Sequence, residues 1–131
     1  MKLLLDTHIW LWTYQNPARL VHSIQEAISD PENERWLSPI SIWEVVILLE
    51  KKRITLHEEM SVWLQKSIEH LALREAPLTW EVAHEVRYIV MGHRDPADHF
   101  LAATARVHGL TLVTSDERLM NISGINVLPN R

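Results

Sequence analysis

The first apolar segment of this chain is a run of three leucines that ends directly on a carboxylate. Leu3-Leu4-Leu5 precedes Asp6, and large apolar residues resume after His8. A short, continuously apolar run is typical of a strand that is buried on both faces of a parallel sheet. A charge at the end of such a strand costs free energy unless something pairs with it. Asp6 therefore either caps the following helix or holds a ligand.

Short apolar runs recur along the chain, and segments of helical periodicity separate them. After the leucine run we expect strands at residues 35–37, 71–77, 110–114 and 125–128. We expect helices at residues 9–15, 20–30, 38–52, 60–71, 79–89 and 95–109, with a short helical turn at 115–120. Pro96 in the first turn and Gly109 past the end delimit the last helix. This alternation predicts an α/β fold with helices on both faces of a central, mostly parallel sheet.

The composition limits the class of protein. The chain has 131 residues, of which 47% are hydrophobic, so we expect a single globular domain over residues 1–131. The absence of cysteine excludes disulfides and thiolate metal sites. No apolar run approaches the roughly 20 residues of a membrane span, and the first residues do not resemble a signal peptide, so we expect a cytoplasmic protein with no membrane contact. The formal net charge of −4 means that contact with nucleic acid would need a local patch.

Four carboxylates are predicted to lie at junctions between strands and helices. Asp6 follows the first strand, and Glu44 lies early in the helix after the second. Asp98 lies in the first turn of the helix at 95–109, and Asp116 follows the strand at 110–114. Ligands of open α/β sheets bind outside the carboxyl ends of the strands. These four acids are therefore the first candidates for a functional site.

Each acid also has a structural explanation when it is taken alone. Ser41 and Glu44 have the spacing of a capping box. Asp95 suits a helix N-cap, and Asp98 lies where the helix dipole favours a negative charge. Asp116 suits a turn. The case for a site comes from the four acids together, because carboxylates that converge repel one another unless a cation compensates.

Oxygen ligands without cysteine favour a hard divalent ion, Mg²⁺ or Mn²⁺. Such an ion at a sheet edge commonly supports phosphate chemistry, because it activates water and neutralises charge in the transition state. A phosphatase of the haloacid dehalogenase type, with Asp6 as nucleophile, would need a second aspartate at position 8. The chain has His8 there. Water is therefore the preferred nucleophile.

Three segments together resemble the PIN-domain family, and in particular the VapC-like ribonuclease toxins of bacterial toxin–antitoxin systems. They are LLLDTHIWLW, LSPISIWEVVILLEKKRI and HRDPADHFLAATARVHGLTLVTSDERL. The resemblance runs from residue 2 to about residue 127. It implies a three-layer α/β/α sandwich with metal-dependent endoribonuclease activity. It also implies that Asp6, Glu44 and Asp98 hold the metal directly, and that Asp116 assists.

The resemblance further implies an RNA substrate, a homodimer and an antitoxin whose helix lies in an apolar groove. Arg94, in the His93-Arg94 pair before the last long helix, and Arg118 are candidates to hold the phosphodiester. Thr114 or Ser115 matches the small hydroxyl residue that the family often carries near its last acid. Two alternatives remain: a non-catalytic module that binds RNA or protein, and a metal-dependent DNA nuclease or phosphatase.

Six tryptophans are too many for all of them to need full burial. We expect Trp36 and Trp43 in the core. Trp10 and Trp12 point about 200° apart around one helix. One of these two is therefore a candidate for an exposed contact with a partner protein.

Overall fold

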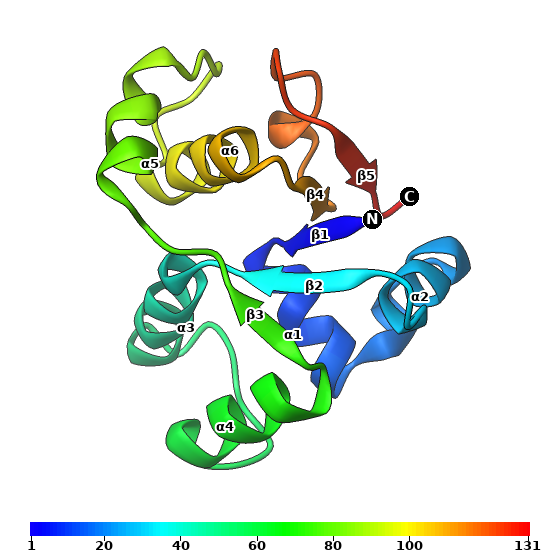
Figure 1. Ribbon diagram of the computed structural model, residues 1–131. Helices are drawn as coiled ribbons and strands as arrows, with labels where there is room; N and C mark the ends of the chain where they lie inside the picture. Colours follow the sequence, from blue (N-terminus) through cyan, green and yellow to red (C-terminus); the bar gives the residue numbers. More distant parts are fainter.

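Five parallel strands form the centre of the protein in the order β3-β2-β1-β4-β5 (Figure 1). The structure is a computed structural model that describes residues 1–131. The strands are β1 (Lys2–Leu5), β2 (Glu34–Leu37), β3 (Leu73–Glu75), β4 (Thr111–Thr114) and β5 (Val127–Pro129). The helices are α1 (Thr7–Gln15), α2 (His22–Ser29), α3 (Pro39–Glu50), α4 (Met60–His70), α5 (Trp80–Glu85) and α6 (Pro96–His108). Three short 3₁₀ turns complete the fold: η1 (Pro17–Arg19), η2 (Val86–Tyr88) and η3 (Glu117–Leu119).

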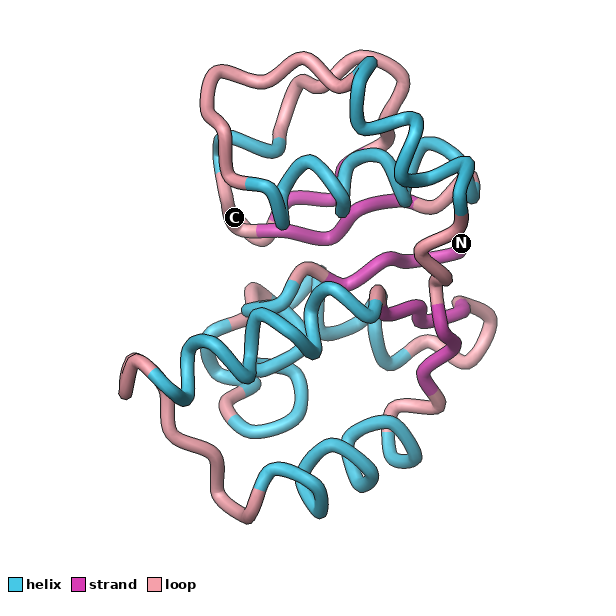
Figure 2. The backbone as a smooth tube through the Cα atoms, turned by 90° about the vertical axis from the view of Figure 1, so that its left-hand side faces the viewer, coloured by secondary structure: helices cyan, strands magenta, loops and turns pink.

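Helices cover the sheet on both faces, as the sequence predicts. α5 and α6 lie on one side of the strands and α1 to α4 on the other, which gives three layers (Figures 1 and 2). Successive side chains of a strand point to opposite faces. Leu3 and Leu5 accordingly pack into the core beneath α1 to α4, whereas Leu4 packs into the core beneath α6. The leucine run is continuously apolar because β1 is buried on both faces.

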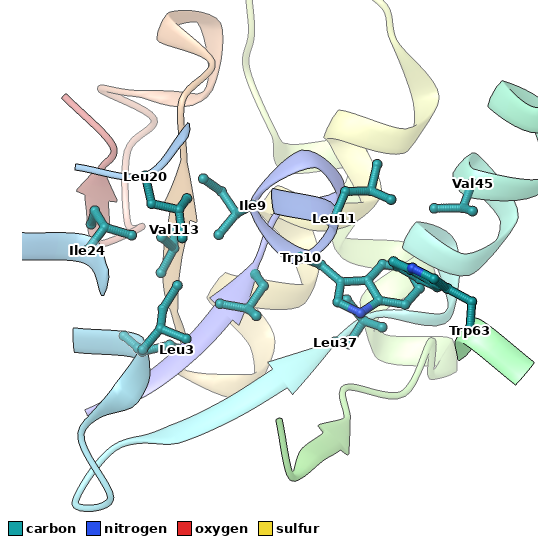
Figure 3. Packing of buried hydrophobic residues seen from close by; sticks show 12 residues of the cluster. Leu3, Ile9, Trp10, Leu11, Leu20, Ile24, Leu37, Val45, Trp63 and Val113 are labelled. Carbon is teal, nitrogen blue, oxygen red and sulfur yellow. The ribbon is translucent and has the colours of Figure 1, made fainter. Parts of the chain in front are cut away.

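Trp10 and Trp63 are the largest side chains of the core beneath α1 to α4 (Figure 3). Both are fully buried, and their ring centroids lie 5.0 Å apart. Each indole N–H has a partner, Ser67 Oγ at 3.2 Å for Trp10 and Gln15 Oε1 at 2.9 Å for Trp63. A buried indole N–H usually has such a partner, because an unsatisfied buried donor costs free energy.

The prediction that Trp43 belongs to the core is wrong. Its side chain is 50% exposed, because α3 turns Val45 inward instead. Trp36 is half-buried and packs against the other core, beneath α6. Its N–H donates to the Glu34 carboxylate at 3.1 Å.

Helix α6 begins and ends where the sequence predicts. The Asp95 side chain accepts a hydrogen bond from the backbone N–H of Ala97 at 3.0 Å, and Gly109 follows the helix with φ of 64°. A residue with a Cβ would be strained in this left-handed conformation. Several element bounds differ from expectation: α5 ends at Glu85 and the 3₁₀ turn η2 follows, β3 covers only Leu73–Glu75, and β5 begins two residues later than predicted.

The carboxyl ends of all five strands lie at the same edge of the sheet, because every pair is parallel. β1 leads into Asp6 and α1, β2 leads into Ser38 and α3, and β4 leads into Ser115 and Asp116. No helix of the structure combines the length and the apolar character that crossing a membrane requires.

Candidate active site

A cavity of about 410 Å³ opens at the carboxyl edge of the sheet, and half of its ten lining residues are acids. These are Asp6, Glu44, Asp95, Asp98 and Asp116. The structure therefore brings together all four acids that the sequence predicts. The fifth, Asp95, is the N-cap of α6 and also reaches the cavity.

Asp6 both caps a helix and faces the cavity. Its Oδ1 accepts a hydrogen bond from the backbone N–H of Thr7 at 2.7 Å, as the N-cap of α1. Its Oδ2 accepts from the Thr114 hydroxyl at 2.6 Å. Burial raises the pKa of the Asp6 carboxyl, and the nearby Asp98 carboxylate raises it further. The N-cap explanation is therefore confirmed, and because Asp6 also lines the cavity, its role in holding a ligand stays a prediction.

Glu44 is held by a hydroxyl rather than by a capping box. The N-cap of α3 is Ser38, whose Oγ accepts from the Ile40 N–H at 3.1 Å, so Ser41 lies inside the helix and the predicted capping box is wrong. Glu44 instead accepts a hydrogen bond from the Thr7 hydroxyl at 2.5 Å. Burial, reinforced by neighbouring carboxylates, raises the pKa of Glu44 from 4.5 to about 7.

Asp98 is the most buried acid of the cavity, with 6% of its surface exposed. It lies in the first turn of α6, and His93 Nε2 is 2.7 Å from its Oδ2. Burial raises the pKa of Asp98, and the carboxylates of Asp95 and Asp116 act in the same direction. The contact with His93 opposes this rise.

Asp116 has a cationic partner within the chain. Arg118 Nε is 3.1 Å from Asp116 Oδ1, and Arg118 Nη2 is 2.8 Å from Asp116 Oδ2. This two-point contact lowers the pKa of Asp116. The same Nη2 lies 3.7 Å from Asp98 Oδ2, so Arg118 reaches across two of the acids.

The donor chemistry of the cavity fits a hard divalent cation. Three of its acids, Asp6, Glu44 and Asp98, have raised pKa values because they are buried near other carboxylates. Their potential ligand atoms are carboxylate oxygens, which Mg²⁺ and Mn²⁺ prefer. No group of three or more His, Asp or Glu side chains is already arranged to hold a metal ion. Each acid is instead turned toward its own hydrogen-bond donor.

The sequence matches the PIN domain family over residues 3–125, a range that contains all four predicted acids. This chain belongs to the PIN domain family. Ribonuclease VapC22 of Mycobacterium tuberculosis is 36% identical to it over 118 residues, which cover 89% of this chain and 88% of that protein.

Two solved structures have the same fold as this PIN domain. The structure of VapBC2 from Rickettsia felis bound to a DNA fragment from its promoter superposes with a TM-score of 0.71 at 16% identity, and the match covers 98% of each chain. A toxin–antitoxin complex from Klebsiella pneumoniae superposes with a TM-score of 0.65 at 21% identity, again covering 98% of each chain. The predicted α/β sandwich is thereby confirmed.

The four residues predicted to contact substrate occupy different environments in this PIN domain. Ser115 and Arg118 line the cavity, although Arg118 is engaged by Asp116. Thr114 is fully buried and its hydroxyl holds Asp6, so its position suits orientation of an acid and is wrong for contact with substrate. Arg94 is exposed and does not line the cavity, and its contact with phosphate stays a prediction.

Sequence reasoning gave no role to Thr7, and it did not single out His93 from its pair with Arg94. Thr7 is buried, and its hydroxyl lies 2.9 Å from Ser41 Oγ as well as holding Glu44. A small hydroxyl residue directly after the first acid was the available signal. His93 reaches Asp98 from a loop five residues away, and no local pattern specified which member of the pair would turn inward.

Proposed function

We propose that this PIN domain is a metal-dependent endoribonuclease, the toxin of a toxin–antitoxin pair acting in the cytoplasm. The observation that carries the proposal is the convergence of Asp6, Glu44, Asp98 and Asp116 on one cavity from four separate segments of the chain. The name of the 36% identical relative, Ribonuclease VapC22, supports RNA as the substrate.

Asp6, Glu44 and Asp98 would hold Mg²⁺ or Mn²⁺, and Asp116 would assist. Such an ion, when bound, lowers the pKa of water and offsets the negative charge of the phosphodiester. Thr114 and Thr7 orient Asp6 and Glu44 through their hydroxyls, as partners of metal ligands do. Because Glu44 has a pKa of about 7, its carboxyl must lose a proton in order to bind the ion near neutral pH.

Arg118 would bind the phosphodiester once it leaves Asp116. Its guanidinium already lies at the cavity, and a planar fork of donors matches phosphate oxygens. In the structure that fork is engaged by the Asp116 carboxylate. An ion that recruits Asp116 would therefore free Arg118 for the substrate.

An antitoxin and a second copy of this chain are the proposed protein partners. The shared fold with a toxin–antitoxin complex from Klebsiella pneumoniae supports the antitoxin. The chain also exposes large apolar side chains that a protein interface could cover. Trp80 is 96% exposed and Val90 86%, and Trp43 on α3 is half exposed.

The direct test is cleavage of total cellular RNA by the purified protein, freed of any antitoxin, with Mg²⁺ or Mn²⁺. The cut ends are mapped, and the same reaction is run with a chelator and with Asp98→Asn. We expect discrete cuts that disappear in both controls. A folded protein that makes no metal-dependent cuts in RNA would reject the proposal. Cuts in DNA alone would move the activity to a DNA nuclease.

A further inference from the structure

Trp12 is the one apolar side chain that lines the acidic cavity, and the side chains of His8 and Arg19 lie next to its indole ring. Trp12, on α1, is half-buried and faces the cavity. The ring of His8, one turn earlier on α1, has its centroid 5.7 Å from that of Trp12. The Arg19 guanidinium carbon lies 4.5 Å from the centre of the indole. We call His8, Trp12 and Arg19 the tryptophan shelf.

Arg19 differs from the other arginine of the cavity. Arg118 makes a two-point ion pair with Asp116. The Arg19 guanidinium instead lies over the face of Trp12 and makes no hydrogen bond or ion pair with the protein. All of its N–H donors therefore remain available to a ligand. The Arg19 and Trp12 planes can stack with a planar group of a ligand, and the charge of Arg19 can bind an anionic group of the same ligand.

The shelf is fixed relative to the acids by contacts on two sides. Asp6 caps the helix that carries Trp12, so both belong to one rigid element and lie ~9 Å apart along its axis. On the other side, the Asn130 amide donates to the backbone oxygen of Arg19 at 3.2 Å and to Ser115 Oγ at 2.8 Å. Asn130 thereby joins the segment of Arg19 to the rim of the cavity.

We infer that the tryptophan shelf binds one unpaired nucleotide next to the phosphodiester that is cleaved. The base stacks on the Trp12 and Arg19 surface, and the Arg19 donors bind the phosphate of the same nucleotide. The inference rests on the proposed function and assigns Trp12 and Arg19, which lie outside the group of acids, to substrate binding.

The physical reason is that aromatic and guanidinium planes recognise bases that are free to stack. Sequence-tolerant binding of single strands combines such stacking with a cation on the backbone. Bases in a double helix are already stacked and paired, so they are not available to Trp12. The overall net charge of −4 makes such a local contact necessary, since no general electrostatic attraction to RNA is present.

The first test measures binding of a random-sequence, fluorescein-labelled 12-nucleotide RNA, single-stranded or annealed to its complement. All proteins carry Asp98→Asn so that no cleavage occurs, and binding is followed by fluorescence anisotropy with Mg²⁺ present. We expect Trp12→Leu to weaken single-strand binding by about 5-fold or more, the loss of one base stack. Trp12→Phe should restore most of it, and Trp80→Leu, which changes a tryptophan outside this cavity, should have no effect.

Arg19→Gln provides a second test that does not touch the packed indole. Because Arg19 is exposed, this variant should fold normally. We expect weaker single-strand binding, and a slope of log affinity against log salt that is smaller by about 0.7, the value for one phosphate contact on a single strand. A change in affinity without a change in slope would overturn the phosphate contact.

Three results would overturn the shelf as a nucleotide site. The first is that Trp12→Leu and Trp80→Leu bind single-stranded RNA with equal affinity. The second is that the starting protein binds single-stranded RNA and duplex with equal affinity. The third is that the shelf variants lose binding only to a protein partner. Failure of the proposed function is a separate outcome. If the protein without Asp98→Asn leaves total RNA uncut while the shelf variants still lose single-strand binding, the nuclease is rejected and the shelf stands.

Discussion

Near the amino edge of the sheet the charged side chain of Arg35 binds backbone groups, whereas at the carboxyl edge acids face one another across a cavity. Arg35, near the start of β2, donates to the backbone oxygens of Leu71 at 2.7 Å, Ile28 at 2.9 Å and Asp30 at 3.2 Å. These carbonyls lie where α2 and α4 end, and a cation is favourable at a helix C-terminus. Polar chemistry at this edge stabilises the fold.

Three acids of the carboxyl edge have the opposite effect on stability. Burial and mutual repulsion raise the pKa values of Asp6, Glu44 and Asp98, so their ionised forms are disfavoured in the folded protein. Perturbed carboxyl groups concentrated in a cleft are typical of functional sites. The two edges therefore meet different requirements, connection of helices at one and ligand binding at the other.

The largest expected effect is that a substitution at the carboxyl edge lowers RNA cleavage, whereas a substitution at the amino edge lowers the unfolding free energy. Asp98→Asn should lower RNA cleavage by more than about 100-fold, beyond the roughly 10- to 100-fold cost of losing an outer partner of a metal ligand. Its unfolding free energy without metal should not fall, because a buried and repelled charge is removed. Arg35→Ala should lower the unfolding free energy by roughly 2 to 4 kcal/mol, since three charge-assisted hydrogen bonds are lost.

RNA cleavage by both variants is measured at a temperature where both are folded. Urea unfolding, measured in parallel, gives the unfolding free energy of each variant. Arg35→Ala should retain the cleavage rate per folded molecule. A loss of cleavage in Arg35→Ala equal to that in Asp98→Asn would show that the edges are not functionally distinct.

A smaller effect concerns the pH dependence of stability without metal. The pKa of Glu44 is raised from 4.5 to about 7, so its stabilising contribution is complete below pH 4.5 and is lost as the pH rises through 7. Glu44→Gln should remove this loss. The unfolding free energy should therefore fall between pH 5 and pH 8 by roughly 1 to 2 kcal/mol more in the unchanged protein than in Glu44→Gln, after allowance for partial solvent exposure.

Thermal and urea unfolding with a chelator at several pH values checks this expectation. Asp116→Asn is the matched variant, because the pKa of Asp116 is lowered by Arg118 and its contribution is lost only as the pH falls below 3.8. It should leave the slope between pH 5 and pH 8 unchanged. Parallel curves for Glu44→Gln and the unchanged protein would contradict the assignment.

The smallest effect concerns competition between Arg118 and a metal ion. Arg118 holds Asp116 and lies near Asp98, so Arg118→Ala should raise the affinity for Mn²⁺ in the absence of RNA. We expect roughly a two- to five-fold increase, the range for an exposed ion pair. Calorimetric titration with Mn²⁺ measures it. Arg131→Ala breaks a similar exposed pair with Glu117 outside the cavity and should leave the affinity unchanged, and weaker binding by Arg118→Ala would refute the competition.

Local sequence patterns were sufficient to predict most of the elements. The apolar run of β1, the Asp95 cap and the Pro96 to Gly109 boundaries of α6 depend on neighbouring residues, and the structure has them where expected. The helix predicted at 79–89 was too long, because its last turn tightens into η2. Trp43 was wrongly placed in the core, since the period of a helix specifies that one face is buried and leaves open which face it is. Trp36, on β2, does pack against the core beneath α6.

The meeting of Asp6, Glu44 and Asp116 could be expected from the order of the elements alone, because they come after β1, β2 and β4, and the carboxyl ends of parallel strands share one edge. Asp98 follows no strand, since α6 comes after η2 and a loop, so its place in the cavity depends on tertiary packing. What each acid binds was settled by the packing of distant segments. Thr7 holds Glu44 from 37 residues away, and Thr114 holds Asp6 from 108 residues away. The same packing turns Trp10 into the core and leaves Trp12 facing the cavity. Such pairings depend on distances between segments that become neighbours only when the sheet and its helices have packed, so no local pattern encodes them.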